Sequence, residues 1–150
     1  MNDPEVIRYL ESGGDYTLAK LKLYLKKVEK NPILFWAIVV RSGKHIGNIK
    51  IDPINYRNRV GEYGILMGDR TEWRKGYAKE ATLTIINYCF SGNENLRKIT
   101  LGVVEDNITA VKLYEDIGFE IEGRYKNHAY HDSKWCNVLR MAIFNPAIVG

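Results

Sequence analysis

Hydrophobic and polar positions follow one another along the chain with two different periods. Residues 16–30 place leucine and valine at helical spacing among lysines, which predicts an amphipathic helix that ends at Asn31–Pro32. Two more helices are predicted over residues 76–90 and 108–117. Apolar runs predict strands over residues 33–41, 45–52, 59–67, 97–104, 119–125 and 135–144. Turns or polar loops are expected over residues 42–44, 52–58 and 126–134.

This order of elements predicts the class of fold. The chain has no internal repeats or linker-like segments, so residues 1–150 are expected to form one α+β domain. Its sheet should be twisted and mostly antiparallel, with helices on its faces. The strands before and after the helix that starts at residue 76 should be parallel neighbours, joined by a right-handed crossover.

Composition narrows the class of protein. The chain is 45% hydrophobic and 27% charged, typical of a soluble globular protein, and no apolar run approaches the ~20 residues that span a bilayer. The net charge of +4 favours solubility over nucleic-acid binding, so neither a membrane nor a nucleic acid is an expected partner. Cys89 and Cys136 lie far apart, which favours reduced cysteines in a cytoplasmic protein. His45, His128 and His131 lack metal-ligand spacing, so no metal is expected.

The most informative stretch, residues 62–80, is an apolar strand followed by a polar turn and a helix. The apolar run breaks at Gly68, and the helix begins near Gly76 after two cations, Arg74 and Lys75. The free N–H groups at a helix start and the helix dipole favour a negative ligand, most often a phosphate. A surface turn with two solvated cations is the alternative interpretation.

A second strand-to-helix segment lies further along the chain, over residues 99–119. Its apolar strand ends in a polar run at residues 105–107, and a short helix then carries apolar side chains at helical spacing. Gly118 stands where helices commonly end, and Phe119 opens the next strand.

In this order and spacing, the two segments resemble the phosphate-binding turn and the asparagine–alanine–leucine–tyrosine helix of the GNAT superfamily of acyl-CoA N-acetyltransferases. The resemblance covers residues 2–144. It implies direct transfer of an acetyl group from acetyl-CoA to a primary amine in a ternary complex. It also implies two central strands that splay apart to admit the pantetheine arm. The residues expected to bind the cofactor are Ile65, Leu66, Met67, Gly68, Arg74, Lys75, Gly76, Tyr77, Ala78 and Asn107.

The resemblance also implies catalytic roles for two residues. Glu62 would act as a general base, often through water; an exposed strand carboxylate is the alternative. Tyr114 would donate a proton to the departing thiolate; a half-buried aromatic side chain that packs its helix is the alternative. Asn107 would cap its helix and also hydrogen-bond the pantetheine. His128 or His131 could assist as a base, although a loop histidine is more often a solvated surface residue.

The chain departs from the family pattern at three points. Trp73 stands where the turn usually has glutamine or arginine, and Arg74 stands where close relatives often have glycine. Residues 2–6 look like a stretch that follows a first strand and helix in relatives, so we expect that first strand to be missing. The exposed sheet edge would then favour pairing of two copies into a homodimer.

The acceptor amine is not identified by the sequence. The chain looks most like the branch of ribosomal-protein N-terminal acetyltransferases, while residues 2–6 and 45–50 look like members that acetylate amino sugars on nucleotide carriers. A protein N-terminus or an amino sugar is therefore the expected acceptor. It should be recognised by the first helix and by the loops near residues 52–59 and 127–131. A non-catalytic acyl-CoA-binding or regulatory module on the same fold is the competing hypothesis.

Overall fold

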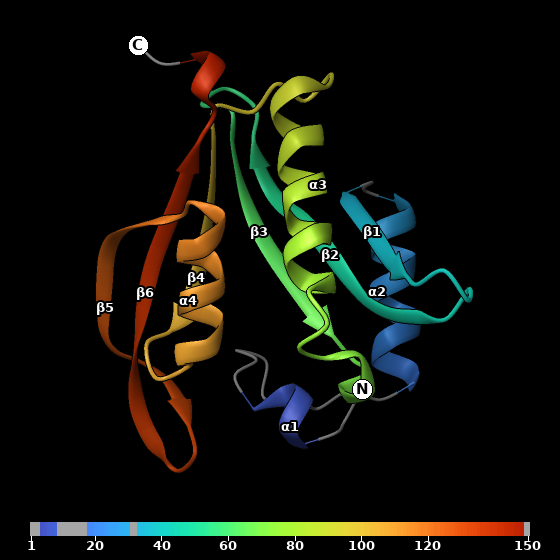
Figure 1. Ribbon diagram of the computed structural model, residues 1–150, viewed down its shortest axis with the longest axis vertical. Helices are drawn as coiled ribbons and strands as arrows, with labels where there is room; N and C mark the ends of the chain where they lie inside the picture. Colours follow the sequence, from blue (N-terminus) through green and yellow to red (C-terminus); the bar gives the residue numbers. More distant parts are fainter. Residues whose placement is uncertain (1–3, 9–17, 31–32, 149–150) are drawn as a thin grey trace.

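Six strands form one sheet in the computed structural model, which describes residues 4–8, 18–30 and 33–148 (Figure 1). The strands are β1 (Leu34–Val39), β2 (His45–Asn55), β3 (Val60–Met67), β4 (Lys98–Val104), β5 (Glu120–His131) and β6 (Lys134–Phe144). The helices are α1 (Pro4–Ile7), α2 (Leu18–Lys30), α3 (Tyr77–Ser91) and α4 (Ile108–Ile117). Two short 3₁₀ turns are η1 (Arg70–Glu72) and η2 (Pro146–Ile148).

Across the sheet the strands follow the order β1-β2-β3-β4-β6-β5. Neighbours run antiparallel except for β3 and β4, which run parallel and are connected through α3. A parallel pair needs such a crossover because the chain must return to the same end of the sheet before the second strand begins. The predicted α+β fold, with a mostly antiparallel sheet and one central parallel pair, is confirmed.

Helices α3 and α4 lie over the same face of the sheet, where one hydrophobic core forms (Figure 1). The strands and both helices contribute to it because each places its apolar side chains on this side. Helix α2 lies on the opposite face, behind β1 and β2 in Figure 1, where Tyr24 contacts Phe35 with ring centroids 6.4 Å apart. The buried core residues are Ile49, Ile51, Tyr63, Ile85, Ile86, Cys89, Leu96, Ile99, Leu101, Val103, Tyr114, Phe119, Leu139 and Met141.

Strand β2 continues further than its sequence predicts. A loop is expected from residue 52, but the strand extends through Pro53 to Asn55. The pairing of β2 with β3 shifts register between Ile51 and Ile54, so Pro53 falls at an irregularity where the ladder does not need its missing N–H. Proline was therefore a misleading signal for the end of the strand.

The polar loop predicted over residues 126–134 is instead the tip of a long hairpin. Strands β5 and β6 extend to His131 and from Lys134, which leaves only Asp132 and Ser133 as the turn. Both turn residues have positive φ, at 50° and 61°, as a two-residue hairpin turn requires. Strand β5 lies at the edge of the sheet and is exposed over most of its length, so it lacks the hydrophobic alternation of a half-buried strand.

The remaining boundaries differ by a residue or two. Helix α3 begins at Tyr77, because Gly76 is its N-cap, and α4 has the predicted bounds. Residues 16 and 17, which were expected to begin the first long helix, lie outside the described residues, as do residues 2 and 3 of the segment that suggested a missing strand. None of the described helices is both long and apolar enough to cross a membrane.

Candidate active site

The centre of the sheet opens into a fork between the two parallel strands. β3 and β4 pair at three positions, and the last pair is Glu62 with Thr100. Beyond it, residues 63–67 of β3 pair only with β2 among the described residues, and the two strands diverge (Figure 1). Over residues 63–67, the edge of β3 that faces β4 therefore has no strand partner among the described residues, although the carbonyl of Met67 accepts a hydrogen bond from Trp73. This is the splayed arrangement that the family resemblance implies.

A turn held by side chains follows the open end of β3. The amides of Gly68 and Asp69 donate to the carbonyl of Ile46 on β2, at 3.0 and 3.3 Å. The indole N–H of Trp73 donates to the carbonyl of Met67 at 2.9 Å. Asp69 caps η1 by accepting from the amide and hydroxyl of Thr71, at 3.0 and 2.6 Å. Trp73, a departure from the family pattern, therefore serves as an anchor of the turn.

The backbone of this turn is left-handed at two nearby positions. Arg74 has φ of 63° and Gly76 has φ of 82°. Gly76 is the N-cap of α3 and has no side chain with which to cap it, so the first N–H groups of the helix remain for water or a ligand. Tyr77 and Ala78, the first two helical residues, carry two of these groups. The turn thus retains the feature that an anionic ligand requires.

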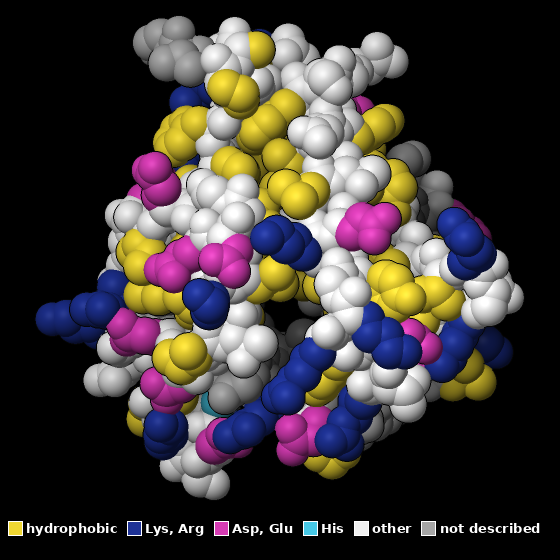
Figure 2. Space-filling view, viewed as in Figure 1, with side chains coloured by type: hydrophobic (Ala, Val, Ile, Leu, Met, Phe, Trp, Pro, Cys, Tyr) yellow, Lys and Arg dark blue, Asp and Glu magenta, His cyan; other side chains and the backbone are white. Residues whose placement is uncertain are grey.

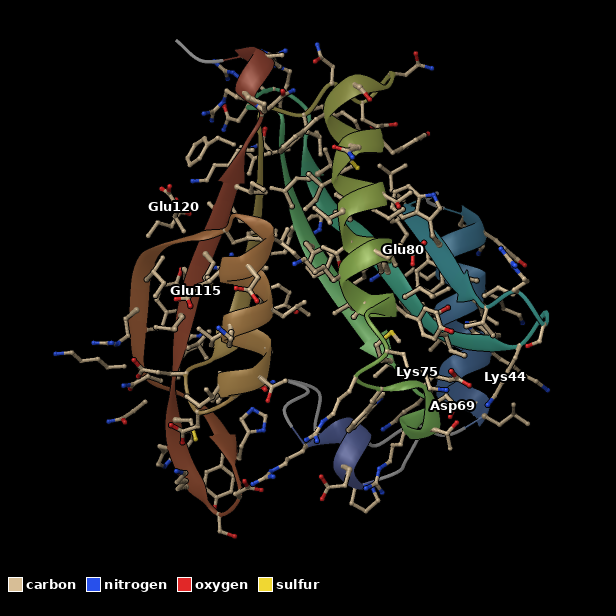
Figure 3. The ribbon with its side chains drawn as sticks, viewed as in Figure 1. Lys44, Asp69, Lys75, Glu80, Glu115 and Glu120 are labelled. Atoms are coloured by element: carbon tan, nitrogen blue, oxygen red, sulfur yellow. The ribbon has the colours of Figure 1, made fainter. Side chains whose placement is uncertain are left out.

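The two cations beside this helix start differ in their contacts. Lys75 lies 2.9 Å from the carboxylate of Glu72, and this hydrogen bond raises the pKa of the lysine. Glu72 also lies 3.6 Å from Lys44, which in turn pairs with Asp69 (Figure 3). Arg74 is exposed, and within the described ranges no ion pair holds its guanidinium. Arg74 is therefore the more available cation for a phosphate, and Lys75 must share its charge with Glu72.

The surface around the fork suits a long, anionic ligand. On the face seen in Figure 2, the surface is hollowed between the halves that carry α3 and α4. Basic side chains gather along the lower part of this hollow, near the foot of α3. Asn107 lies across the fork, after β4, and caps α4 by accepting from the amide of Ala110 at 3.3 Å. The predicted cap is confirmed, and the predicted contact with pantetheine stays a prediction.

Two tyrosines lie under the fork, on the helix-covered face. Tyr63 of β3 meets Tyr114 of α4 edge to face, and Phe119 packs against both rings. The hydroxyl groups of Tyr63 and Thr82 lie 2.8 Å apart. Tyr114 is only 8% exposed, and this burial raises its pKa to about 12. A phenol in this environment stays protonated, as a proton donor must.

Glu62 projects to the opposite face of the sheet, where three hydrogen bonds hold its carboxylate. Arg140 of β6 donates to both oxygens, at 2.9 and 2.7 Å, and the hydroxyl of Thr100 donates to one of them at 2.7 Å. Burial by itself would raise the pKa of Glu62, but these hydrogen bonds and the positive charges of Arg140 and Lys50 outweigh it and lower the pKa. Glu62 is therefore a structured ion-pair partner rather than a freely exposed strand carboxylate.

Sequence reasoning missed Arg140 and Thr100. Each is a polar residue within a strand that is otherwise strongly apolar, and this contrast was the available signal. Glu62 and Thr100 also line an open cavity of about 540 Å³ together with Pro53 and Ile54. The carboxylate consequently remains within reach of solvent or a ligand.

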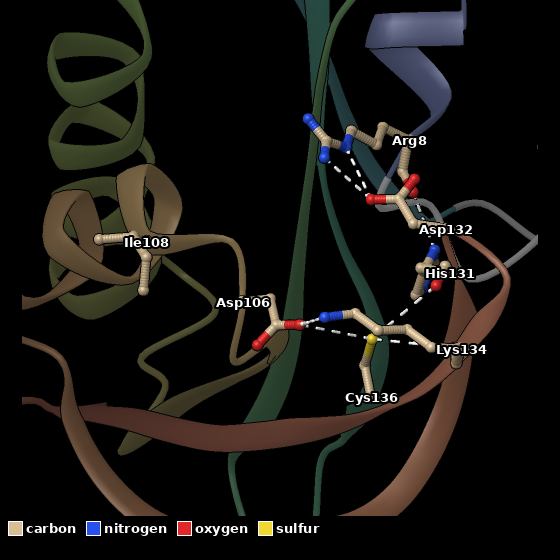
Figure 4. A pocket seen from close by; sticks show the side chains of 7 residues that line it. All are labelled: Arg8, Asp106, Ile108, His131, Asp132, Lys134 and Cys136. Atoms are coloured by element: carbon tan, nitrogen blue, oxygen red, sulfur yellow. Dashed lines mark hydrogen bonds and ion pairs between the residues drawn. The ribbon is translucent and has the colours of Figure 1, made fainter.

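A second cavity, of about 310 Å³, lies between α1, the start of α4 and the β5–β6 hairpin (Figure 4). Its carboxylates are already paired: Asp106 with Lys134 at 2.7 Å and Asp132 with Arg8 at 2.9 Å. His131, expected in a solvated loop, is instead buried in β5, and its Nδ1 lies 2.8 Å from the carbonyl of Arg8. His131 is thus a structural contact of the N-terminal segment in this arrangement.

No group of three or more histidine, cysteine, aspartate or glutamate residues within the described ranges could hold a metal ion. The residues present do fit acetyl-CoA. The free edge of β3 offers backbone groups to the amides of its pantetheine arm, and the uncapped start of α3 offers N–H groups to its pyrophosphate. The thioester, at the end of this arm away from the pyrophosphate, would then lie towards the Glu62–Thr100 pair.

A fork of this kind beside an uncapped helix start fits an acyl-CoA-dependent transferase. A family model described as an acetyltransferase (GNAT) domain matches residues 1–120. The chain belongs to the GNAT family. Membership confirms the expectation of an acetyl-CoA-dependent N-acetyltransferase that acts on an amine.

Individual relatives agree with this assignment. The uncharacterized N-acetyltransferase p20 of Bacillus licheniformis is 25% identical and covers 99% of this chain and 85% of its own length. A spermidine N(1)-acetyltransferase of Vibrio cholerae is 30% identical over 81% of this chain and 69% of its own. The crystal structure of a Vibrio cholerae spermidine N-acetyltransferase with CoA and spermine has a TM-score of 0.88 and 28% identity. It covers 96% of this chain and 85% of that one.

Proposed function

We propose that the protein acetylates a primary amine of a polyamine such as spermidine. The similarity to spermidine N-acetyltransferases supports this acceptor. The ribosomal-protein branch and the amino-sugar members, which the sequence resembles in short stretches, find no support in these relatives. A small polycationic amine therefore replaces a protein N-terminus or an amino sugar as the proposed acceptor.

The observation that carries the proposal is the fork itself. β3 and β4 separate directly after the Glu62–Thr100 pair, and the turn at the end of β3 leads into a helix without a side-chain cap. Acetyl-CoA would lie along Ile65, Leu66 and Met67 with its pyrophosphate at Gly76. The acceptor would approach from the face that carries Glu62, so that amine and thioester meet at the point where the strands part.

The transfer then needs no covalent intermediate on the protein. The neutral amine attacks the carbonyl carbon of the thioester, the new C–N bond forms, and the C–S bond breaks as the tetrahedral intermediate collapses. Tyr114 donates its proton to the departing thiolate and is reprotonated from solvent. The amine gives up one proton to water. Glu62 is ionised and paired with Arg140, so it can accept a hydrogen bond from the acceptor amine without taking its proton.

A polyamine carries more than one ammonium group, and the chain offers further carboxylates near the open end of the fork. Asp106 directly precedes Asn107, and Asp132 lies at the hairpin tip beside the second cavity. Their present partners, Lys134 and Arg8, are exposed and could be displaced by an ammonium group of the substrate. These two aspartates are therefore the proposed contacts for the far end of the acceptor.

A thiol-release assay with acetyl-CoA and a panel of amines tests the proposal. The panel contains spermidine, spermine, a monoamine of matched chain length, an L-amino acid, an amino sugar and a short peptide with a free N-terminus. Spermidine or spermine should give the highest kcat/KM, and Asp132→Asn should raise KM for these two acceptors while leaving the monoamine unaffected. A preference for the peptide or the amino sugar would overturn the polyamine assignment. Thermal stabilisation by acetyl-CoA without thiol release from any amine would favour a binding module.

Two further expectations remain proposals. Cys89 and Cys136 are both free and buried, in keeping with a reducing, cytoplasmic setting. The expected homodimer stays a prediction, to be checked by light scattering of the purified protein.

A further inference from the structure

We infer that Arg140 is the positioning residue of this site. It holds the Glu62 carboxylate ionised and in one orientation at the last residue pair between β3 and β4. The inference rests on the proposed acetyltransferase function. It changes the expected role of Glu62: because Arg140 and Lys50 offset its charge, the carboxylate acts as a fixed hydrogen-bond acceptor for the amine, and not as the base that accepts its proton.

The hydrogen bonds around Glu62 leave its carboxylate little freedom. Nη1 of Arg140 donates to Oε1 at 2.9 Å, and Nη2 donates to Oε2 at 2.7 Å. Thr100 adds a third donor from β4 to the same Oε2. Such a two-pronged pairing fixes both the position and the plane of a carboxylate, which a lysine cannot do with a single ammonium group. Three strands of the sheet therefore act together to orient one side chain.

The sheet also leaves space for the guanidinium at one position. Gly102 on β4 stands directly opposite Arg140 in the register of β4 and β6. A Cβ atom at Gly102 would lie 2.8 Å from Nη1 of Arg140, closer than nonbonded atoms normally approach. The ring of Tyr125 on β5 lies 5.9 Å from the guanidinium carbon. The arginine is thus placed over a glycine and beside an aromatic ring, in the position from which it reaches Glu62.

Among the described residues, the two charged groups that act on this carboxylate both favour its ionised form. Lys50 lies on β2 and Arg140 on β6, while Thr100 on β4 donates a hydrogen bond. Glu122 and Tyr125 on β5 act on Arg140 itself and help to keep it protonated. Although burial raises the pKa of Glu62, the combined effect of its partners lowers it. A carboxylate whose pKa is lowered below its ordinary value is a poor acceptor for an ammonium proton.

The test compares how Glu62 titrates in the wild type, Arg140→Gln and Arg140→Lys. We expect the acid limb of the profile of kcat/KM against pH, measured with acetyl-CoA and spermidine, to move up by about one to three pH units in Arg140→Gln. Arg140→Lys keeps the charge but loses the two-pronged pairing, so its limb should move less. Carboxyl ¹³C NMR of glutamate-labelled protein measures the same titration without any acetyl transfer, and Glu62→Gln identifies the resonance.

A pair of glycine substitutions separates position from charge. Gly102→Ala leaves every charge in place but pushes the guanidinium away from Glu62. Gly123→Ala is the matched control, because its Cβ would lie 3.9 Å from Cβ of Arg140, an ordinary contact. Gly102→Ala should therefore raise the pH at which Glu62 titrates, as Arg140→Gln does, and Gly123→Ala should leave that pH unchanged.

The possible outcomes distinguish this inference from the function on which it rests. An unchanged Glu62 titration in both Arg140→Gln and Gly102→Ala overturns the inference, even if both variants are less stable or less active. If Arg140→Gln does not fold, Arg140→Lys and Gly102→Ala give the decision. A shifted titration by NMR in a protein that acetylates no amine supports the role of Arg140 in holding Glu62 and rejects only the proposed function.

Discussion

Tyr63 and Tyr114 meet edge to face beneath the fork, with ring centroids 5.8 Å apart and an angle of 82° between their planes. The two phenols also share a hydrogen bond, but their further roles differ. That of Tyr63 is within hydrogen-bonding distance of Thr82 on α3, which gives it a structural partner. Tyr114 is the residue for which the family resemblance implies a proton donor, and burial keeps it protonated by raising its pKa to about 12. The same aromatic cluster thus combines one structural and one candidate catalytic phenol.

Replacing Tyr114 with phenylalanine should lower kcat on the order of a hundredfold with little change in KM, because only the proton donor is removed. Steady-state kinetics with acetyl-CoA and spermidine measure both constants. Tyr63→Phe is the matched control: it removes the neighbouring hydroxyl and should cost stability without a comparable loss of kcat. Wild-type kcat in Tyr114→Phe would leave Tyr114 with a packing role only.

Elements with clear signals at both ends were predicted well from the sequence. The bounds of α4 were correct because Asn107 caps one end and Gly118, with φ of 117°, closes the other. The hairpin of β5 and β6 was predicted too short because an edge strand exposed to solvent needs no hydrophobic alternation. The residues at the two ends were thus sufficient to predict the helix. The length of each hairpin strand depends instead on its pairing with the other strand.

In the candidate site, too, some residues could be predicted from the sequence and others could not. Glu62 and the Gly76 turn stand in contiguous motifs and could be found in the sequence. The partners of Glu62 could not, because Thr100 and Arg140 meet it only through the registers of β3 with β4 and of β4 with β6. Residues that are distant in the sequence carry no local sign of such a contact. The low proton affinity of Glu62 therefore emerged from the structure alone.

The stability of the turn between β3 and α3 at acid pH should depend on Asp69. Its hydrogen bonds with Lys44 and Thr71 lower its pKa to about 2, below the value of about 3.9 expected in the unfolded chain. The stabilisation from Asp69 is therefore fully present above about pH 4 and is lost as the pH falls towards about 2. Urea unfolding at a series of pH values should show Asp69→Asn less stable than wild type at neutral pH, with the difference vanishing in acid.

Coenzyme A binding provides the control for this substitution. Asp69→Asn loosens the turn that follows β3 and should weaken the binding of coenzyme A. Asp132→Asn removes an exposed ion pair at the hairpin tip and should leave this affinity unchanged. A constant difference in stability across the whole pH range would show that Asp69 does not titrate as described.

Gly76→Val should abolish binding of coenzyme A. The reason is the backbone: a side chain at this position would meet no atom within 4 Å, but φ of 82° is a conformation that valine strongly disfavours. If the valine left this backbone conformation, the first amides of α3 would turn away from the pyrophosphate. Helix propensity suggests no stability loss, yet the left-handed backbone should cost roughly 1–2 kcal/mol of folding free energy. Isothermal titration calorimetry and urea unfolding measure the two effects.

The turn between β1 and β2 offers a matched control for this strain. Gly43 has φ of 86° and equally open space around a Cβ atom. Gly43→Val should lose a similar amount of stability and bind coenzyme A as the wild type does. Wild-type affinity in Gly76→Val would place the phosphates elsewhere, and equal losses of affinity in both variants would point to general damage.

Arg74 stands where close relatives often have glycine, and its φ of 63° explains why glycine suits the position. An arginine in this conformation is strained, so we expect it to be kept for its charge. Arg74→Gly relieves the strain but adds freedom to the unfolded chain, so stability should change by less than about 1 kcal/mol. Affinity for coenzyme A should fall roughly tenfold as one charge-assisted contact is lost.

Arg59 is the matched control for Arg74, since its φ is 52° in the turn before β3, at the other end of that strand. Arg59→Gly should have the same small effect on stability and none on the cofactor. The loss in Arg74→Gly should shrink as salt is added, because mobile ions screen an exposed charge. Comparing coenzyme A with its form lacking the 3′-phosphate then locates the contact: a loss confined to coenzyme A assigns Arg74 to that phosphate, and an equal loss assigns it to the pyrophosphate. Unchanged affinity for both ligands would reduce Arg74 to a solvated cation on a surface turn.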